Sequence, residues 1–400
     1  MFDPEYTIDG PRVAAPDRER LWESVLRAPF RIVFSPLWLL GKGLEAGVGY
    51  VGPRFLEPKA KHPPKPGLAL APYINPGVGR DIGVGPAITW VGFPTADSRL
   101  HLTAMWSLED RRRVNLSETI GDRRPVGFLL HADYDHKPNS RFYGIGNSAS
   151  ETDLSHFLLE QTSADAALLL SASPLRQFRI VAGFSSMSPG RGYNGEPLLE
   201  DVFPTGAPYE QQTTKELWYG FTADFAALDD ERNPSRGAHG RLDLRRAAGL
   251  RSSDPDYYQW RVECRAYVPV FAKRRVIAVR GVFAGVDPDG GDATVMPYYR
   301  LAQSTCASRF AGYSSERFRD RQLMLGRIEY RWEILHRLSA LALYELGEVA
   351  PSTGSFTLRE AHQSIGGGLR LGVSDEGTMR IELAKGTEGL QAVFALGSDF

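Results

Sequence analysis

The stretch that decides the fold is YQWRVECRAYV, residues 258–268. Successive side chains of a β-strand point to opposite faces, so the alternation in this stretch predicts one apolar and one polar face. The polar face carries Arg261, Glu263 and Arg265, charges of both signs in the middle of the strand. The apolar face consists of Tyr258, Trp260, Val262, Cys264, Ala266 and Val268. A charged strand face of this kind needs a wet or internally paired interior.

The same period-two pattern recurs from about residue 67 onward, in sixteen segments. They are residues 67–74, 81–93, 98–106, 112–120, 125–136, 154–171, 176–187, 215–228, 238–248, 257–270, 273–285, 321–333, 335–347, 361–373, 378–385 and 389–398. An even set of strands of roughly ten residues, apolar on one side and polar on the other, is typical of an outer-membrane barrel. The predicted fold class is therefore all-β, a 16-stranded antiparallel transmembrane β-barrel. A soluble lipocalin-like or sandwich protein is the alternative.

The connections between these segments alternate in length. The long ones cover residues 137–153, 188–214 and 286–320, and most of the intervening ones are tight. Outer-membrane barrels have short periplasmic turns and longer extracellular loops. We therefore expect the long connections on the extracellular side and both termini in the periplasm.

Composition excludes several classes of protein. The net charge of −1 lacks the basic excess of a polyanion binder, so we expect no nucleic-acid partner. No apolar run is long enough for a transmembrane helix. Cys264 and Cys306 match no metal-ligand spacing, and either a disulfide between them or two unrelated thiols fits the sequence. His131, Asp133 and Asp135 share a lumen face that could bind a divalent metal, but a polar channel wall explains them better. We expect no metal and no cofactor.

Residues 1–66 do not share the period-two pattern. The segment around 18–45 mixes apolar and aromatic residues with arginines, and PKAKHPPKPG (58–67) resembles a linker rich in Pro and Lys. Two interpretations fit: an interfacial helical or irregular segment on the periplasmic leaflet, or a plug inside the barrel. We therefore divide the chain into an N-terminal segment, 1–66, and a barrel domain, 67–400.

Several motifs of the barrel region occur in an order that resembles BamA/TamA-type proteins. They are RFYGIGNSASETD (141–153), DDERNPSRGAHGRLDLR (229–245), RFAGYSSERFRDRQLMLGRIEYRW (309–332), ALYELGEV (342–349), and the run from SIGGGLRLGV to the terminal Phe (364–400). Such proteins carry the bacterial surface antigen domain, a sixteen-stranded barrel of assembly factors and two-partner secretion translocases. The resemblance covers about residues 67–400. Because residues 1–66 lack the family's periplasmic repeats, we expect a short branch of the family without them.

The resemblance implies that the loop at about 286–320 folds into the barrel. In the family, the tip of this loop carries an aliphatic–Arg–Gly–aromatic motif, whose arginine docks on an acidic residue of the inner wall. Here the matching stretch is Phe310–Ala311–Gly312–Tyr313, with alanine in the arginine position. The wall motif resembles Leu343–Tyr344–Glu345–Leu346–Gly347, with Glu345 in the acidic position.

An inward carboxylate without a cationic partner is costly. We therefore predict that Arg317 or Arg319, in place of residue 311, meets Glu345 or Glu329. The full set of candidates for locking the loop is Arg309, Gly312, Tyr313, Arg317, Arg319, Glu345, Gly347 and Glu329.

Two further groups of residues follow from the resemblance. The last predicted strand ends in a terminal aromatic residue, which resembles the C-terminal signal of bacterial barrels; its residues are Phe394, Leu396 and Phe400. A glycine run would allow bending near the seam between the first and last strands; its residues are Gly366, Gly367 and Gly368.

The function implied by the resemblance is assistance with the insertion or translocation of proteins or lipids at the bacterial outer membrane. The expected partners are outer-membrane lipid (lipopolysaccharide or phospholipid) and either a protein partner complex or unfolded outer-membrane substrates. The chain has no GxSxG elbow, and we expect no enzymatic activity. The alternative function is a passive pore, or a scaffold subunit of a larger outer-membrane complex without insertase activity.

Overall fold

A computed structural model describes most of the barrel region. The described residues are 66–75, 83–121, 124–173, 176–193, 197–204, 212–230, 233–270, 275–290, 296–304, 310–335, 338–374 and 377–396. Residues 1–65 lie outside them, so the two interpretations of the N-terminal segment, an interfacial segment and a plug, concern residues that are not described. Cys306 and Arg309 also lie outside them.

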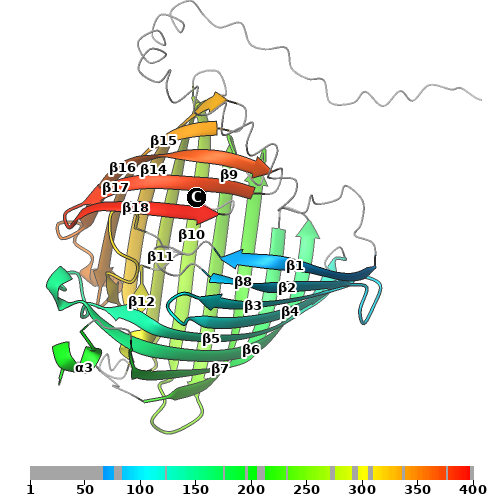
Figure 1. Ribbon diagram of the computed structural model, residues 1–400, viewed down its shortest axis with the longest axis horizontal. Helices are drawn as coiled ribbons and strands as arrows, with labels where there is room; N and C mark the ends of the chain where they lie inside the picture. The colour runs from blue at the N-terminus through cyan, green and yellow to red at the C-terminus, as the bar shows by residue number, and fades with distance from the viewer. Residues whose placement is uncertain are drawn as a thin grey trace, which may run out of the picture.

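Sixteen strands form one antiparallel sheet in which each strand pairs with the next along the chain (Figure 1). They are β1 Gly67–Asn75, β2 Gly83–Val91, β3 Ser98–Ser107, β4 Arg112–Ile120, β5 Val126–Phe142, β6 Ser155–Ser173, β7 Arg176–Arg191, β8 Thr214–Leu228, β9 Gly237–Gly249, β10 Tyr257–Val270, β11 Arg275–Pro288, β14 Gln322–Leu335, β15 Leu338–Ala350, β16 His362–Ser374, β17 Gly377–Gly386 and β18 Gly389–Leu396. The predicted fold class is confirmed, and each of the sixteen predicted segments corresponds to one of these strands.

The two faces of the strands differ as the period-two pattern predicts. In β10, Tyr258, Val262 and Val268 are exposed on the outer, apolar face, whereas Glu263 is buried on the inner face. Arg261 and Arg265 flank Glu263 on that inner face and ion-pair with it. The charges in mid-strand are therefore accommodated by pairing inside the barrel.

The longest connections of the barrel all lie at one end. We name five connections of this end after the strands they follow: L3 (143–154, after β5), L4 (192–213, after β7), L6 (289–321, after β11), L7 (351–361, after β15) and the two-residue turn L8 (387–388, after β17). Their end is called the long-loop end and the opposite one the short-turn end. β5 continues to Phe142, beyond its predicted end at residue 136, because its polar residues stay paired with β6 where the apolar alternation has stopped.

The sheet does not close into a fully paired ring. In the described residues, β1 and β18 each pair with one neighbour, β2 and β17 respectively, and not with each other. Figure 1 shows β18 in red and β1 in blue as facing edges of the sheet. We call this unpaired boundary the seam.

Short elements of the loops lie at the long-loop end. They are η1 Glu151–Asp153 in L3, α3 Leu199–Val202 in L4, η3 Tyr298–Arg300 and the two-residue strands β12 Ala302–Gln303 and β13 Arg319–Asp320 in L6, and η5 Thr353–Ser355 in L7. Within the described residues, no helix has the length and apolar character needed to cross a membrane.

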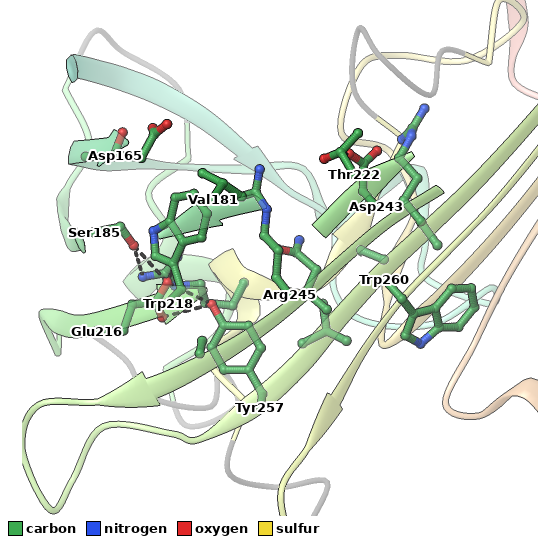
Figure 2. Close-up of a pocket in the computed structure, with 18 of the residues that line it drawn as sticks. Asp165, Val181, Ser185, Glu216, Trp218, Thr222, Asp243, Arg245, Tyr257 and Trp260 are labelled. Atoms are coloured by element: carbon green, nitrogen blue, oxygen red, sulfur yellow. Dashed lines mark hydrogen bonds and ion pairs between the residues drawn. The ribbon is translucent and has the colours of Figure 1, made fainter. Parts of the chain in front are cut away.

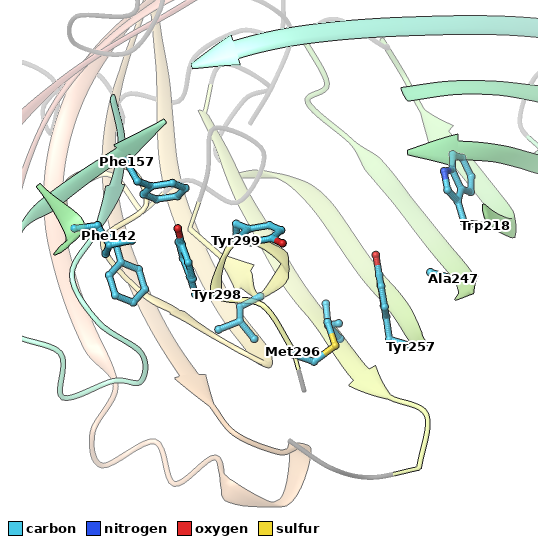
Figure 3. Close-up of a cluster of buried hydrophobic side chains, with 11 residues drawn as sticks. Phe142, Phe157, Trp218, Ala247, Tyr257, Met296, Tyr298 and Tyr299 are labelled. Carbon is cyan, nitrogen blue, oxygen red and sulfur yellow. The ribbon is translucent and has the colours of Figure 1, made fainter. Parts of the chain in front are cut away.

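Aromatic side chains of L6 and the inner wall form a hydrophobic core near the long-loop end (Figure 3). Tyr298 of η3 packs against Phe142 and Phe157, with ring centroids 5.0 and 4.9 Å apart. Tyr299 lies beside Tyr298, 5.3 Å away in an edge-on arrangement. Burying these rings holds L6 against the wall, because each aromatic side chain removes a large apolar area from water.

Candidate functional site: the inward-folded loop and the lumen

The described part of L6 lies inside the barrel. Its side chains Phe310, Tyr313 and Phe318 are buried to 3–4% exposure. They form one cluster with inward-facing wall residues Val282, Leu323, Leu325 and Val349. A loop whose aromatic residues occupy the lumen closes part of the mouth with protein rather than water.

Two glycines allow the tip of L6 to approach the wall closely. A Cβ on Gly312 would lie 2.3 Å from Cβ of Ser364 in β16, and a Cβ on Gly386 in β17 would lie 2.6 Å from the carbonyl oxygen of Gly312. Tyr313 follows and donates its hydroxyl to the carbonyl oxygen of Gln363 at 3.1 Å. On the other side of the tip, a Cβ on Gly347 would meet the Phe310 ring at 3.1 Å. Gly312, Tyr313 and Gly347 thus meet at one docking point.

Glu345 is fully buried at this docking point and receives three donors. The backbone N–H of Ala311 donates to Oε2 at 2.7 Å, and the hydroxyl of Ser364 donates to the same oxygen at 2.7 Å. The third donor is Nη1 of Arg327 in β14, which lies 2.8 Å from Oε1. A buried carboxylate is tolerated when it is paired and its lone pairs are satisfied. The loop therefore offers Glu345 a peptide N–H, and the wall supplies the positive charge.

Arg327 belongs to a larger ionic network on the inner wall of β14, β15 and β17. Glu329 accepts from Arg327, Arg331 and Arg380, each at 2.7 Å. Arg327 also donates to Glu382 at 2.7 Å, and Arg380 contacts the same carboxylate. With Glu345, these contacts join three arginines and three glutamates, and a further arginine, Arg370 of β16, is buried close to Arg331 and Arg380.

The predicted pairing of Arg317 or Arg319 with Glu345 or Glu329 is wrong. Arg317 instead binds Glu388 of L8, with Nε 2.8 Å from Oε1 and Nη2 2.7 Å from the same oxygen. Arg319 donates to the carbonyl oxygens of Arg141 and Tyr298 at 2.7 and 3.2 Å. The reason is the strand register. Arg327 lies directly opposite Glu345 in the β14–β15 pair and forms an ion pair with its carboxylate, so Glu345 already has a cationic partner on the wall.

A second ionic contact joins L6 to the opposite wall. Glu316 is buried, ion-pairs with Lys137 of β5 and accepts the backbone N–H of Arg141 at 2.8 Å. Burial alone would raise the pKa of Glu316, but the charges of Lys137 and Arg319 lower it to about 2. Glu316 is therefore ionised at neutral pH and ties L6 to β5.

The predicted C-terminal signal and the predicted glycine run belong to other parts of the chain, at β18 and its end and in β16. Phe394 is on the outer face of β18; the side chain of Leu396 and the whole of Phe400 lie outside the described residues. Gly366, Gly367 and Gly368 lie in a continuous ladder between β15 and β17, two strands from the seam. A Cβ on Gly366 would meet the carbonyl oxygen of Leu383 at 2.4 Å, so this glycine permits close strand approach. The roles proposed for these two groups remain predictions.

A water-accessible cavity of about 680 Å³ lies between L6 and the wall of β4 to β11. Glu216 of β8 accepts from Ser185 and Tyr257, each at 2.8 Å, and pairs with Arg300 of L6 at 3.1 Å (Figure 2). Arg245 points into the cavity and stacks on Trp218, 4.4 Å from the ring centroid. The cavity is thus polar and carries charges of both signs.

His131, Asp133 and Asp135 lie on the lumen face but bind other side chains. His131 bonds Asp165 at 2.9 Å, Asp133 pairs with Arg113 at 2.9 Å, and Asp135 pairs with Arg111 at 2.6 Å. In the part of the chain that the structure describes, no group of three or more His, Cys, Asp or Glu side chains could hold a metal ion.

Sequence reasoning missed four residues of this site. Arg327 lies opposite Glu345 only because a β-bulge between Glu333 and Leu335 shifts the register by one residue; counting back from the short turn would have placed Leu346 there. No local feature of the sequence marks Lys137, Glu316 or Glu388 as residues of this site. Their partners are 179 and 71 positions away in sequence, and only the folded loop brings them together.

The fold and the inward loop define a class of protein: an antiparallel sixteen-stranded outer-membrane-type barrel with a loop inside its lumen. The Omp85 superfamily domain matches residues 97–400. The chain therefore belongs to the Omp85 superfamily, and the predicted BamA/TamA-like assignment is confirmed. It is accordingly an integral β-barrel of the Gram-negative outer membrane, of a class concerned with protein insertion or translocation.

Solved structures that are similar to this chain include a BamA and a CdiB. BamA from Haemophilus ducreyi lacking POTRA domains 1–3 matches with a TM-score of 0.63 and 15% identity, over 83% of this chain and 70% of that one. CdiB from Acinetobacter baumannii matches with a TM-score of 0.51 and 10% identity, over 82% of this chain and 59% of that one. No curated protein matches the sequence. At these identities the likenesses support the fold.

Proposed function

We propose that this protein assists the insertion or translocation of proteins at the outer membrane, with the seam between β1 and β18 as the exit toward the lipid. The observation that carries the proposal is the seam itself: among the described strands, fifteen neighbouring pairs are hydrogen-bonded, and β1 and β18 are not. Unpaired strand edges are templates for another strand. An unfolded outer-membrane protein could add its first strand at such an edge by β-augmentation.

In this proposal both termini are periplasmic and the long-loop end is extracellular. Short turns on the periplasmic side and long loops outside are the usual arrangement of bacterial barrels. The substrate enters from the periplasm, and the surrounding phospholipid and lipopolysaccharide receive it. The reaction is an exchange of strand pairing and requires no enzymatic step.

The filled mouth argues against the alternative of a steadily open passive pore. Phe310, Tyr313, Phe318 and the cluster around Tyr298 occupy the lumen near the long-loop end. A barrel that served only for diffusion would have a water-filled lumen. A scaffold role within a larger complex would leave the seam unused, and this difference is what the experiment tests.

The test is a cross-link across the seam. Cysteines replace Leu70 in β1 and Ala392 in β18, both on the outer face, in a background with Cys264→Ser and Cys306→Ser, and are joined by a cleavable bifunctional thiol reagent. The readout is insertion of an unfolded outer-membrane barrel into proteoliposomes. We expect the cross-linked protein to lose insertion and to regain it when the linker is cleaved.

The matched control shares one of the two cysteines. Leu383 and Ala392 face each other in the β17–β18 pair, so the L383C/A392C cross-link joins strands that are already paired. It should leave insertion unchanged. Full insertion by the seam-linked L70C/A392C protein would overturn the proposal and favour the scaffold alternative.

A further inference from the structure

The loops complete the ring that the sheet leaves open. Strand pairing runs from β1 to β18 in one direction and stops at the seam. L3 belongs to the first strands of this order, and L7 and L8 belong to the last. Contacts between L3 and the last strands therefore join the two sides of the seam at the long-loop end.

Asn147 of L3 makes the first set of these contacts. Its side-chain oxygen accepts the backbone N–H of Val349 in β15 at 3.3 Å, and its carbonyl oxygen accepts Nε2 of His362 in β16 at 2.9 Å. Its side-chain amide also donates to the carbonyl oxygen of Glu360 in L7. One residue from the β5–β6 side thus binds both strands and the loop of the β15–β16 hairpin.

The local sequence explains how Asn147 reaches that hairpin. Gly144 and Gly146 have φ values of +101° and +97°, a backbone conformation that other residues rarely adopt. They bend L3 inward over the mouth within the sequence YGIGN, residues 143–147. The N–H of Gly146 also donates to the carbonyl oxygen of Arg319 at 2.9 Å, which fixes L3 on L6.

Arg317 of L6 makes the second set of contacts. Its guanidinium pairs with Glu388 in L8 and donates to the carbonyl oxygen of Ala149 in L3 at 2.6 Å. Its carbon Cζ lies 4.9 Å from the Tyr143 ring centroid and 4.6 Å from that of Phe318. The side chain is 3% exposed. A single buried cation therefore bridges the loop next to β18 and the loop after β5.

We propose that Asn147 and Arg317 form a clasp that holds the long-loop end of the barrel closed across the seam. Because the clasp lies at one end of an unpaired boundary, separation of β1 from β18 begins at the short-turn end. The clasp rests on the proposed function only in treating the seam as an exit; its geometry and its test do not depend on insertion activity.

The experiment measures the two ends of the seam separately by pulsed electron paramagnetic resonance. Spin labels at Glu151 in L3 and Leu390 in β18 report on the long-loop end. Labels at Leu68 in β1 and Phe394 in β18 report on the short-turn end. All labels are attached to cysteines in the background with Cys264→Ser and Cys306→Ser, in purified full-length protein in lipid nanodiscs.

We expect a single narrow distance distribution for the 151/390 pair and a broader one for the 68/394 pair. Replacing Asn147 by Ala together with Glu388→Gln should broaden the 151/390 distribution and move it to longer distance. Glu388→Gln is chosen because it removes the charge without emptying the buried site of Arg317. The charge exchange Arg317→Glu with Glu388→Arg should restore part of the narrow distribution.

Arg246→Gln is the matched control, because Arg246 forms an ion pair of 2.6 Å with Asp289 at the same end of the barrel but between neighbouring hairpins. It should leave the 151/390 distribution unchanged. Retention of the folded band on unheated gels verifies the fold of each variant. An unchanged 151/390 distribution in the N147A/E388Q variant would overturn the clasp, and so would a long, broad distribution in the intact protein.

Discussion

At the scale of single residues, the site depends on how buried charges are balanced. Glu345 and Glu329 are each 0% exposed, and both use Arg327 as a partner. A loop arginine is absent from position 311, and the wall arginine takes over its charge. At Glu345 itself, the loop contributes a peptide N–H and the wall contributes the charge.

Replacing Arg327 by Met should destabilise the barrel strongly. It removes one cation from contact with three buried carboxylates, and breaking a buried ion pair costs about 3–5 kcal/mol. Samples are heated to graded temperatures and run on gels without boiling. The temperature at which the folded band disappears measures the effect. Arg112→Met, which removes an exposed pair with Asp110, should change this temperature little. Equal temperatures for both variants would contradict the account of the network.

The lowered pKa of Glu316 predicts that the stability of the protein depends on pH. Its pKa is lowered from an ordinary 4.5 to about 2, so its contribution is complete above pH 4.5 and is lost as the pH falls toward 2. A shift of this size corresponds to about 3 kcal/mol. Urea unfolding in micelles should show Glu316→Gln less stable than the wild type at pH 7 and nearly equal to it near pH 2. A constant difference across this range would count against an ionised Glu316.

At the scale of elements, L6 acts as a folded unit held by close packing. Its tip fits because Gly312 meets Ser364 and Gly347 leaves room for Phe310. Arg317 and Arg319, at 3% and 2% exposure, are withdrawn from solvent as a consequence. L6 is thus protected from proteases as long as its tip is docked.

Gly312→Ala should undock the tip of L6. The new methyl group would lie 2.3 Å from Cβ of Ser364, a distance that forces the loop to move. Trypsin should then cleave after Arg317 and Arg319 in the folded protein, and mass spectrometry of the fragments identifies the cuts. Gly281→Ala in β11 is the control, since a Cβ there has no atom within 4 Å. Resistance of the Gly312→Ala protein to trypsin would show that the tip tolerates the methyl group.

At the scale of the whole molecule, the barrel combines an unpaired seam with a filled mouth. Under the proposed function the seam is the lateral route to lipid, and the L6 aromatic residues fill the lumen along the axial route. These two features together distinguish a barrel that releases its substrate sideways from one that conducts solutes along its axis.

Deleting L6 residues 297–319 and joining the ends with a Gly/Ser linker should convert the protein into a steady channel. The deletion removes the aromatic residues that fill the mouth, so water and ions can occupy the lumen. In planar bilayers, we expect small and unsteady currents from the intact protein and large, steady ones from the deletion variant. Large steady currents from the intact protein would favour the passive pore.

The sequence by itself determined the strands, their number and their two faces. The physical reason is local: a strand's side chains alternate, so lipid on one side and a charged lumen on the other leave a period-two record in each segment. The inward position of Glu263 and the outward position of Val262 follow from that record. The resemblance of short motifs added the family, and the domain match confirmed it.

Only the tertiary structure decided which charges meet. Arg317 pairs with Glu388, 71 positions away, and Asn147 binds a hairpin about 200 positions further along the chain. Such contacts depend on the path of loops that have no repeating pattern. A buried carboxylate accepts whichever donor the register and the loop bring within about 3 Å. The alternation of residues could therefore predict that Glu345 faces inward, and only the folded chain could assign Arg327 as its partner.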